Sequence, residues 1–199
     1  MTSPHRTRAP RSRRTPGRVV VVLAVVVATA AACASGGQRP PGLLFGPGDP
    51  SSSVGGDPDG RIGDRVATAA DDDLAAIARL DPDLLAALRR ATRDAARDGV
   101  AVQVTSGWRS RAYQQDLLDE AEATYGSLEE ARRWVSTPEE SAHTRGDAVD
   151  VGPTDAAYWM SRYGAEHGLC QVYGNEIWHY ELLTEPGGTC PEPRTDGAS

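Results

Sequence analysis

Apolar residues recur at helical spacing in the stretch that follows Asp81-Pro82. Leucine or alanine stands at positions 84, 85, 88, 91 and 95, and Gly99 closes the stretch. An aspartate cap, a proline in the first turn and a glycine after the last turn are typical of an α-helix, so we predict one here. Valine then occupies positions 100, 102 and 104, and this period of two predicts a β-strand.

The rest of the pattern mixes helices and strands without a regular strand-helix-strand repeat. We expect helices over about 111–123, from a capping box at Ser127 and Glu130 to near Val135, and from Thr154 or Asp155 to His167. We expect strands over about 147–152, 170–173 and 177–183. This order favours the α+β class.

The first 32 residues have a pattern of their own. Residues 1–18 carry six arginines and no acidic residue, residues 19–32 are apolar or small, and Cys33 follows. This is the layout of an export signal, and the apolar run is shorter than the roughly 20 residues of a membrane-spanning helix. We therefore expect residues 1–32 to be a signal peptide and Cys33 to be lipidated, which anchors a lipoprotein to the outer face of the bacterial cytoplasmic membrane. Secretion without a lipid is the alternative.

Composition then separates a linker from a folded part. Residues 33–64 are rich in Gly, Pro and Ser and lack apolar periodicity, so we expect a disordered tether behind the lipidated cysteine. We expect residues 65–190 to fold as one domain and residues 191–199 to form an irregular tail. A monomer is the default expectation for the oligomeric state.

Charge excludes several classes of function. Without residues 1–32 the chain keeps 15 arginines against 28 acidic residues, a formal charge near −13. Such a chain lacks the basic face that nucleic-acid binding requires. The sequence also contains no lysine, which excludes Ser-x-x-Lys acyl-enzymes, Schiff-base enzymes and Walker-type phosphate loops.

Two cysteines remain once Cys33 is assigned to the lipid. In an exported chain, Cys170 and Cys190 most simply form a disulfide. The bridge would close a loop of about 20 residues that contains Glu176 and His179. Metal binding by these cysteines is the alternative, although they lack the Cys-x-x-Cys spacing of most such sites.

Residues suited to a metal centre gather in two short segments. Segment 141–150 offers His143 and Asp150, and segment 176–180 offers His179 together with Glu176. Two imidazoles and one carboxylate match the protein ligands of a catalytic zinc site, in which a fourth position stays open for water. We therefore predict one Zn2+ per chain. Glu176, in a turn before the strand, is predicted to act as general base and then as proton donor.

Three motifs resemble those of a known family. They are Ser-x-His-x-x-Gly-x-Ala-x-Asp at 141–150, Glu-x-Trp-His at 176–179 and Ser-Gly-Trp-Arg-Ser-x-x-x-Gln at 106–114. In these motifs, over about residues 80–183, the chain resembles the VanY-type zinc D-alanyl-D-alanine carboxypeptidases. The resemblance implies a small single-domain metallopeptidase of the Hedgehog/DD-peptidase fold, with a central antiparallel sheet flanked by helices. It also implies that peptidoglycan stem peptides are the substrates and that the terminal D-Ala-D-Ala bond is cut.

The resemblance also implies roles for single residues. His143, Asp150 and His179 would bind zinc, Glu176 would be the catalytic base, and Arg109 would polarise the scissile carbonyl. Substrate contacts would come from the remaining motif positions, namely Trp108, Gln114, Ser141 and Trp178.

Two other functions share these features. An endopeptidase that cuts the L-Ala-D-Glu bond has the same fold, and a Hedgehog-type domain can keep the metal without catalysis and bind the cell wall. A D,D-dipeptidase fits less well, because free dipeptide is cytoplasmic and this chain is predicted to be exported. The presence of Glu176 and of all three expected ligands favours an enzyme.

Overall fold

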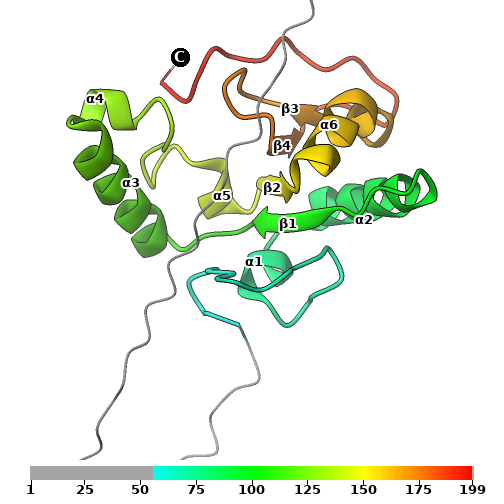
Figure 1. The fold of residues 1–199 in the computed structure, drawn as a ribbon, viewed down its shortest axis with the longest axis horizontal. Helices are drawn as coiled ribbons and strands as arrows, with labels where there is room; N and C mark the ends of the chain where they lie inside the picture. The colour runs from blue at the N-terminus through cyan, green and yellow to red at the C-terminus, as the bar shows by residue number, and fades with distance from the viewer. Residues whose placement is uncertain (1–55, 199) are drawn as a thin grey trace, which may run out of the picture. The chain divides into compact units, whose positions relative to one another are not determined.

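Four short strands form one sheet in the computed structural model, which describes residues 56–198 (Figure 1). The strands are β1 (Gln103–Ser106), β2 (Ala148–Gly152), β3 (Leu169–Gln171) and β4 (His179–Leu182). Their order is β1-β2-β4-β3, and each neighbouring pair is antiparallel. The predicted α+β class with an antiparallel sheet is therefore confirmed. The predicted signal peptide, Cys33 and residues 33–55 of the predicted tether lie outside the described residues.

Helices lie on both sides of this sheet. They are α1 (Ala75–Ala78), α2 (Pro82–Arg97), α3 (Arg111–Tyr125), α4 (Leu128–Ala131), α5 (Ala142–Arg145), α6 (Thr154–Tyr163) and the 3-10 helix η1 (Gly164–His167). Helices α2 and α6 contact the strands, whereas α3 and α4 pack together at the far side of the domain (Figure 1). None of the helices in residues 56–198 has the length and apolar character needed to span a bilayer.

Helix α2 begins and ends where local signals place it. Asp81 is its N-cap, and the Asp81 Oδ1 accepts hydrogen bonds from the amides of Asp83 and Leu84 at 2.9 and 3.0 Å. Pro82 occupies the first turn, where its missing N–H costs nothing. Gly99 follows the helix with φ +78°, a conformation that glycine adopts without strain. The helix predicted after Asp81 is thus confirmed.

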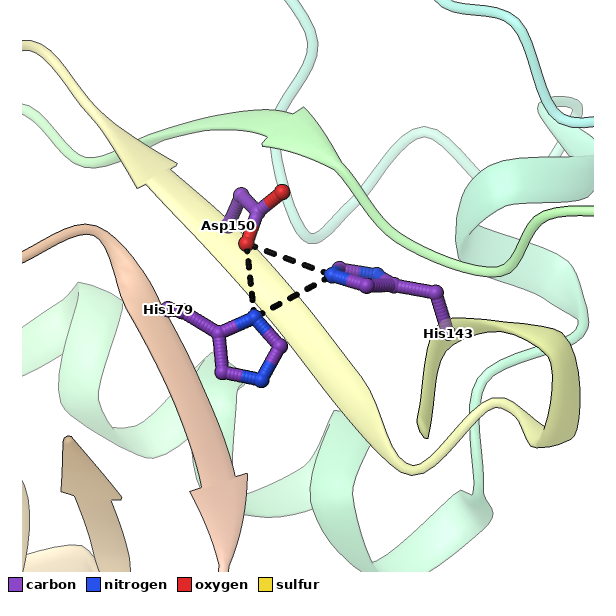
Figure 2. Close-up of side chains that lie close together, drawn as sticks. All are labelled: His143, Asp150 and His179. Carbon is purple, nitrogen blue, oxygen red and sulfur yellow. Dashed lines mark hydrogen bonds and ion pairs between the residues drawn. The ribbon is translucent and has the colours of Figure 1, made fainter. Parts of the chain in front are cut away.

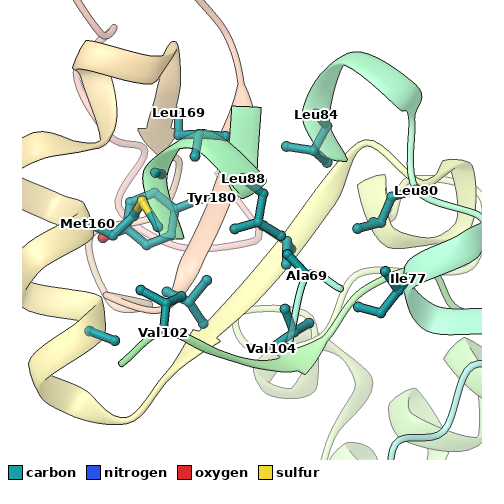
Figure 3. Packing of buried hydrophobic residues seen from close by; sticks show 14 of the residues in the cluster. Ala69, Ile77, Leu80, Leu84, Leu88, Val102, Val104, Met160, Leu169 and Tyr180 are labelled. Atoms are coloured by element: carbon teal, nitrogen blue, oxygen red, sulfur yellow. The ribbon is translucent and has the colours of Figure 1, made fainter. Parts of the chain in front are cut away.

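Alternate residues of the central strands point to opposite faces of the sheet. Val149 and Val151 of β2 and Tyr180 of β4 are buried in the core with α2 and α6, and the Tyr180 hydroxyl donates a 2.9 Å hydrogen bond to the Ala157 carbonyl. Figure 3 shows this core, in which leucines of α2 meet Val104, Met160 and Leu169. Asp150 and His179 are the cross-strand neighbours that alternate with these core residues, so they share the other face.

Several predicted element boundaries differ from those of the structure. The helix predicted to end near Val135 ends at Ala131, and the strand predicted from about 177 begins at His179. Helix α6 is capped by Pro153, not by Thr154 or Asp155, because the Pro153 carbonyl already accepts the amides of Ala156 and Ala157. The strand predicted from Val100 begins only at Gln103.

The domain also begins earlier than predicted. Residues 56–64 were assigned to the disordered tether, but the side chain of Ile62 is buried in the core. Arg61 lies 3.9 Å from the centre of the Tyr113 ring and forms an ion pair with Asp116 at 2.5 Å. These long-range contacts order a segment that has no apolar periodicity of its own.

The C-terminal segment is more regular than the irregular tail we predicted for residues 191–199. After the Cys170–Cys190 disulfide, the Arg194 amide donates to the Val172 carbonyl at 2.9 Å, and the Gly174 amide donates to the Arg194 carbonyl at 2.7 Å. The segment then returns toward α4 (Figure 1), where Asp196 pairs with Arg133 at 2.9 Å. The tail therefore braces the turn that precedes β4.

Candidate metal centre

Three side chains from different elements point at one spot (Figure 2). His143 comes from α5, Asp150 from β2 and His179 from β4. The distances are 3.1 Å from Asp150 Oδ1 to His179 Nδ1, 3.3 Å from Asp150 Oδ1 to His143 Nε2, and 3.2 Å between the two ring nitrogens. All three side chains are buried. The structure thus brings together the three ligands predicted from the sequence.

This spacing fits a tetrahedral ion. Bonds of about 2.0–2.1 Å from zinc to nitrogen or oxygen place the ligand atoms of a tetrahedron about 3.3–3.4 Å apart, close to the separations in this site. Charge agrees with the geometry. When both imidazoles are neutral, as metal ligands are, and the carboxylates of Asp150, Glu176 and Glu181 are ionised, they face a single positive charge among the described side chains of the centre, that of Arg109. A divalent cation would balance the two negative charges in excess.

Each of the three side chains is held from behind by a second partner. His143 Nδ1 donates to the Gly107 carbonyl at 2.8 Å, which leaves Nε2 unprotonated toward the centre. Asp150 Oδ2 accepts from Arg109 Nη2 at 2.8 Å. His179 Nε2 lies 3.3 Å from Glu181 Oε1, so its Nδ1 faces the centre. Such outer partners fix the orientation of metal ligands.

Two glycines allow the loops to approach closely enough. Gly146 follows α5 with φ +84°, and a Cβ there would lie 2.4 Å from the Arg79 carbonyl oxygen. A Cβ on Gly107 would lie 2.1 Å from the Ala76 carbonyl oxygen. The backbone path that places His143 against the Gly107 carbonyl therefore requires glycine at both positions.

Arg109 is held mainly by the protein itself. Its Nε donates to Ser106 Oγ at 2.8 Å, its Nη1 to Gln114 Oε1 at 3.1 Å and its Nη2 to Asp150. Gln114 in turn donates to the Ser136 carbonyl at 2.8 Å. The motif from Ser106 to Gln114 is therefore a scaffold for Asp150, and both polar atoms of Gln114 are engaged within the chain rather than offered to a substrate.

The charges at the centre shift the pKa values of the three side chains. Burial lowers the pKa of His143. Burial alone would raise the pKa of Asp150, but the two histidines and Arg109 outweigh it and hold the pKa well below its usual range. Burial alone would lower the pKa of His179, but hydrogen bonds with Asp150 and Glu181 raise it to about 9. Without a metal, His179 therefore carries a proton at neutral pH.

Glu176 lies beside the centre without joining it. It sits in the turn before β4, as predicted, and its Oε2 is 3.9 Å from His179 Nδ1. Burial raises the pKa of Glu176 to about 7. A carboxylate with this pKa exchanges protons readily near neutral pH.

A cavity of about 190 Å³ opens over the centre. Of the predicted substrate contacts, Ser141, Gln114 and Trp178 line it. Trp108 is not among the lining residues, and its ring lies under the Arg79 guanidinium at 4.3 Å. The structure thus places Trp108 away from this cavity, and its substrate contact stays a prediction. The rest of the cavity wall was not predicted from the sequence; it is formed by Leu117, Trp134, Val135, Ser136, Ala142 and Tyr173.

The missed residues carry only weak signals in the sequence. Tyr173 precedes Glu176 by three residues, and its ring centre lies 5.1 Å from that of His179. Glu181 follows His179 by two residues, so the alternation of a strand puts both on one face. That spacing was visible in the sequence and could have identified Glu181.

Comparisons with known proteins agree with this geometry. A family model described as VanY, D-alanyl-D-alanine carboxypeptidase, matches residues 77–182. A D-alanyl-D-alanine carboxypeptidase of Enterococcus faecalis (strain ATCC 700802 / V583) is 32% identical over 116 residues, which make up 45% of this chain and 43% of that protein. The match therefore spans less than half the length of that curated relative.

Two solved structures match at 26% identity and a TM-score of 0.50, over 53% of this chain. One is a glutamate-to-alanine variant of the vancomycin resistance D,D-pentapeptidase VanY from a VanB-type resistance cassette, in complex with Zn(II), and 73% of that chain is covered. The other is VanYB in complex with D-alanine-D-alanine, with 72% covered.

Proposed function

Because the chain belongs to the VanY family of D-alanyl-D-alanine carboxypeptidases, we propose that it is a zinc-dependent peptidase that removes the terminal D-alanine from peptidoglycan stem peptides. One observation carries the proposal: three ligand atoms stand 3.1–3.3 Å apart in a buried site, beside a carboxylate that stays outside the triad. Three protein ligands and a free glutamate are what a hydrolytic zinc site needs. The VanY relative with zinc supports the choice of metal.

Each residue of the site has a part in the proposed reaction. A zinc ion held by His143, Asp150 and His179 would supply the Lewis acidity that makes water nucleophilic near neutral pH and polarises a peptide carbonyl. Glu176 accepts one proton from the attacking water while the oxygen adds to the carbonyl carbon of the penultimate D-alanine. Glu176 then gives this proton to the amine of the leaving D-alanine as the C–N bond breaks. Its pKa of about 7 suits both transfers.

Arg109 contributes mainly by holding Asp150. Its guanidinium also lines the cavity, where its fixed positive charge would stabilise the carbonyl oxygen that becomes negative during the attack. The cavity supplies the rest of the binding site, because Leu117, Trp134 and Val135 offer apolar surface to the methyl groups of a D-alanine pair. VanYB in complex with D-alanine-D-alanine supports this class of ligand.

We place the enzyme outside the cytoplasm, on the outer face of the bacterial membrane. The proposal rests on the export pattern of residues 1–32 and on Cys33, whose lipid would anchor the chain. The Cys170–Cys190 disulfide supports an oxidising compartment. Secretion without a lipid is the alternative, and mass spectrometry of the mature N-terminus distinguishes the two.

Digestion of purified muropeptides, with the products read by mass spectrometry, tests the proposed bond. We expect pentapeptide stems to lose one alanine residue. Cleavage between L-Ala and D-Glu would instead identify the protein as an endopeptidase of the same fold. If no muropeptide is cleaved, the remaining function is that of a non-catalytic wall-binding domain. We expect a chelator to stop the reaction, added zinc to restore it and penicillin to have no effect. Inhibition by penicillin without inhibition by the chelator would contradict the zinc assignment.

A further inference from the structure

Glu181 is a partly buried carboxylate on the same face of β4 as His179. The two residues are separated by one position along the strand, so both side chains leave the sheet on the side of the metal centre. The Glu181 side chain is only 14% exposed, and its Oε1 lies 3.3 Å from His179 Nε2. The opposite ring nitrogen of His179 faces Asp150 and His143. The imidazole ring of His179 therefore lies between Glu181 and the candidate metal position.

The described residues around Glu181 offer it one hydrogen-bond partner, the His179 ring. In the sheet, Ala148 on β2 and Cys170 on β3 are its cross-strand neighbours, and neither offers a charge. The hollow beyond it is lined by leucines and by the carboxylates of Asp81, Asp83 and Asp147. A carboxylate that is mostly removed from water needs a hydrogen-bond or charge partner. Within residues 56–198, the Glu181 carboxylate has that partner in the His179 ring.

The other two candidate ligands have outer partners of a different kind. A neutral backbone carbonyl holds His143, and a cationic guanidinium holds Asp150. Of these three outer partners, only the one behind His179 is an anion. A carboxylate behind an imidazole keeps the proton on the far nitrogen, turns the other nitrogen toward the metal and makes that nitrogen a stronger donor.

We propose that Glu181 is a positioning residue that fixes the ring orientation and tautomer of His179 and so strengthens metal binding at the centre. The proposal rests on the metal site of the proposed function. It does not depend on which peptide bond is cut. Ala148 supports it, because a larger side chain opposite Glu181 would crowd the carboxylate away from the ring.

Two substitutions and one matched control test this role. Glu181→Ala removes the acceptor, whereas Glu181→Gln keeps an oxygen that can accept the hydrogen bond from Nε2 but removes the charge. Glu185→Gln is the control, because it makes the same chemical change at an exposed position four residues later. Zinc affinity is measured by competition with a chromophoric chelator, and the melting temperature of each metal-free protein checks that it is folded. The visible absorption of the cobalt(II) form reports the geometry at the metal.

We expect Glu181→Ala to bind zinc about 10–100-fold more weakly, as is typical when an outer partner of a metal ligand is lost. Glu181→Gln should fall between Glu181→Ala and the wild type, and Glu185→Gln should match the wild type. Among the three variants, Glu181→Ala should show the largest change in the cobalt(II) absorption spectrum. Zinc affinity within twofold of wild type in Glu181→Ala, with an unchanged cobalt(II) spectrum, would overturn the proposal. If Glu181→Ala does not fold, the same two readings on Glu181→Gln decide it.

The wild type in the same experiment separates this inference from the proposed function. A wild-type protein that binds zinc but releases no D-alanine refutes the proposed peptidase activity, while the affinities of the variants still decide the role of Glu181. A wild-type protein that binds no zinc refutes the metal site and Glu181's role with it.

Discussion

Asp150 Oδ1 on β2 lies 3.1 Å from His179 Nδ1 on the neighbouring strand β4. The two residues are direct partners in the antiparallel register, so the spacing of the strands themselves sets this separation. His143 comes from the short helix α5 instead, and the Gly107 carbonyl holds its ring. Two of the three candidate ligands are thus fixed by the pairing of neighbouring strands in the sheet. The side chains of the candidate centre are therefore held in place by the fold before any ion binds.

Arg109 should be sensitive to a conservative change. Lysine carries all its donors on one nitrogen, so it cannot reach Ser106, Gln114 and Asp150 from three separate positions as the planar guanidinium does through Nε, Nη1 and Nη2. We expect Arg109→Lys to weaken zinc binding about tenfold or more, because Asp150 loses its outer partner. Arg111→Lys is the matched control, since Arg111 is exposed and pairs with Glu139 away from the centre. Equal zinc affinities of the two variants would refute the role of Arg109.

Zinc binding should release a proton. In the metal-free site the pKa of His179 is raised to about 9 by its carboxylate neighbours, so the ring is protonated below that pH. The metal needs the lone pair of Nδ1 and displaces this proton. At about pH 8, above the pKa of Glu176, we expect His179 to supply close to one proton per zinc, to which ionisation of a zinc-bound water adds. Calorimetric titrations in buffers of different ionisation enthalpy measure it, and binding without proton release would show that His179 is neutral.

Local signals in the sequence were sufficient to predict several parts of the structure. Asp81, Pro82 and Gly99 delimit α2 because capping depends on near neighbours in the chain. The candidate ligands were recognised because two histidines and a carboxylate, close together in short motifs, match the ligand set of a catalytic zinc site.

The sequence was less informative where contacts are long-range. Residues 56–64 have the composition of a linker, yet Ile62 reaches the core and Arg61 stacks on Tyr113. Trp108 is adjacent to Arg109 in the motif, but adjacent side chains point in different directions, and its ring packs under Arg79. Cross-strand partners and the far wall of a cavity are set by tertiary packing, which no single segment encodes.

The Cys170–Cys190 disulfide should contribute measurably to stability. It closes a loop with a sequence separation of 20 residues, and chain-entropy arithmetic assigns about 3 kcal/mol to such a loop. We expect the double variant Cys170→Ala/Cys190→Ala to lose about this free energy of unfolding in urea. Reducing agent should destabilise the wild type and leave the double variant unchanged. A difference below about 1 kcal/mol would show that the Arg194 and Asp196 contacts hold the tail without the bridge.

D-alanine release by a Glu176→Gln variant tests the central claim most directly. A synthetic stem pentapeptide ending in D-Ala-D-Ala is incubated with wild type and variant, and zinc content is measured on the same samples. Glutamine is nearly isosteric but cannot accept the proton, so we expect D-alanine release to fall by about 10²–10⁴-fold while both proteins hold about one zinc per chain. Release at the wild-type rate by the zinc-loaded variant would contradict the account.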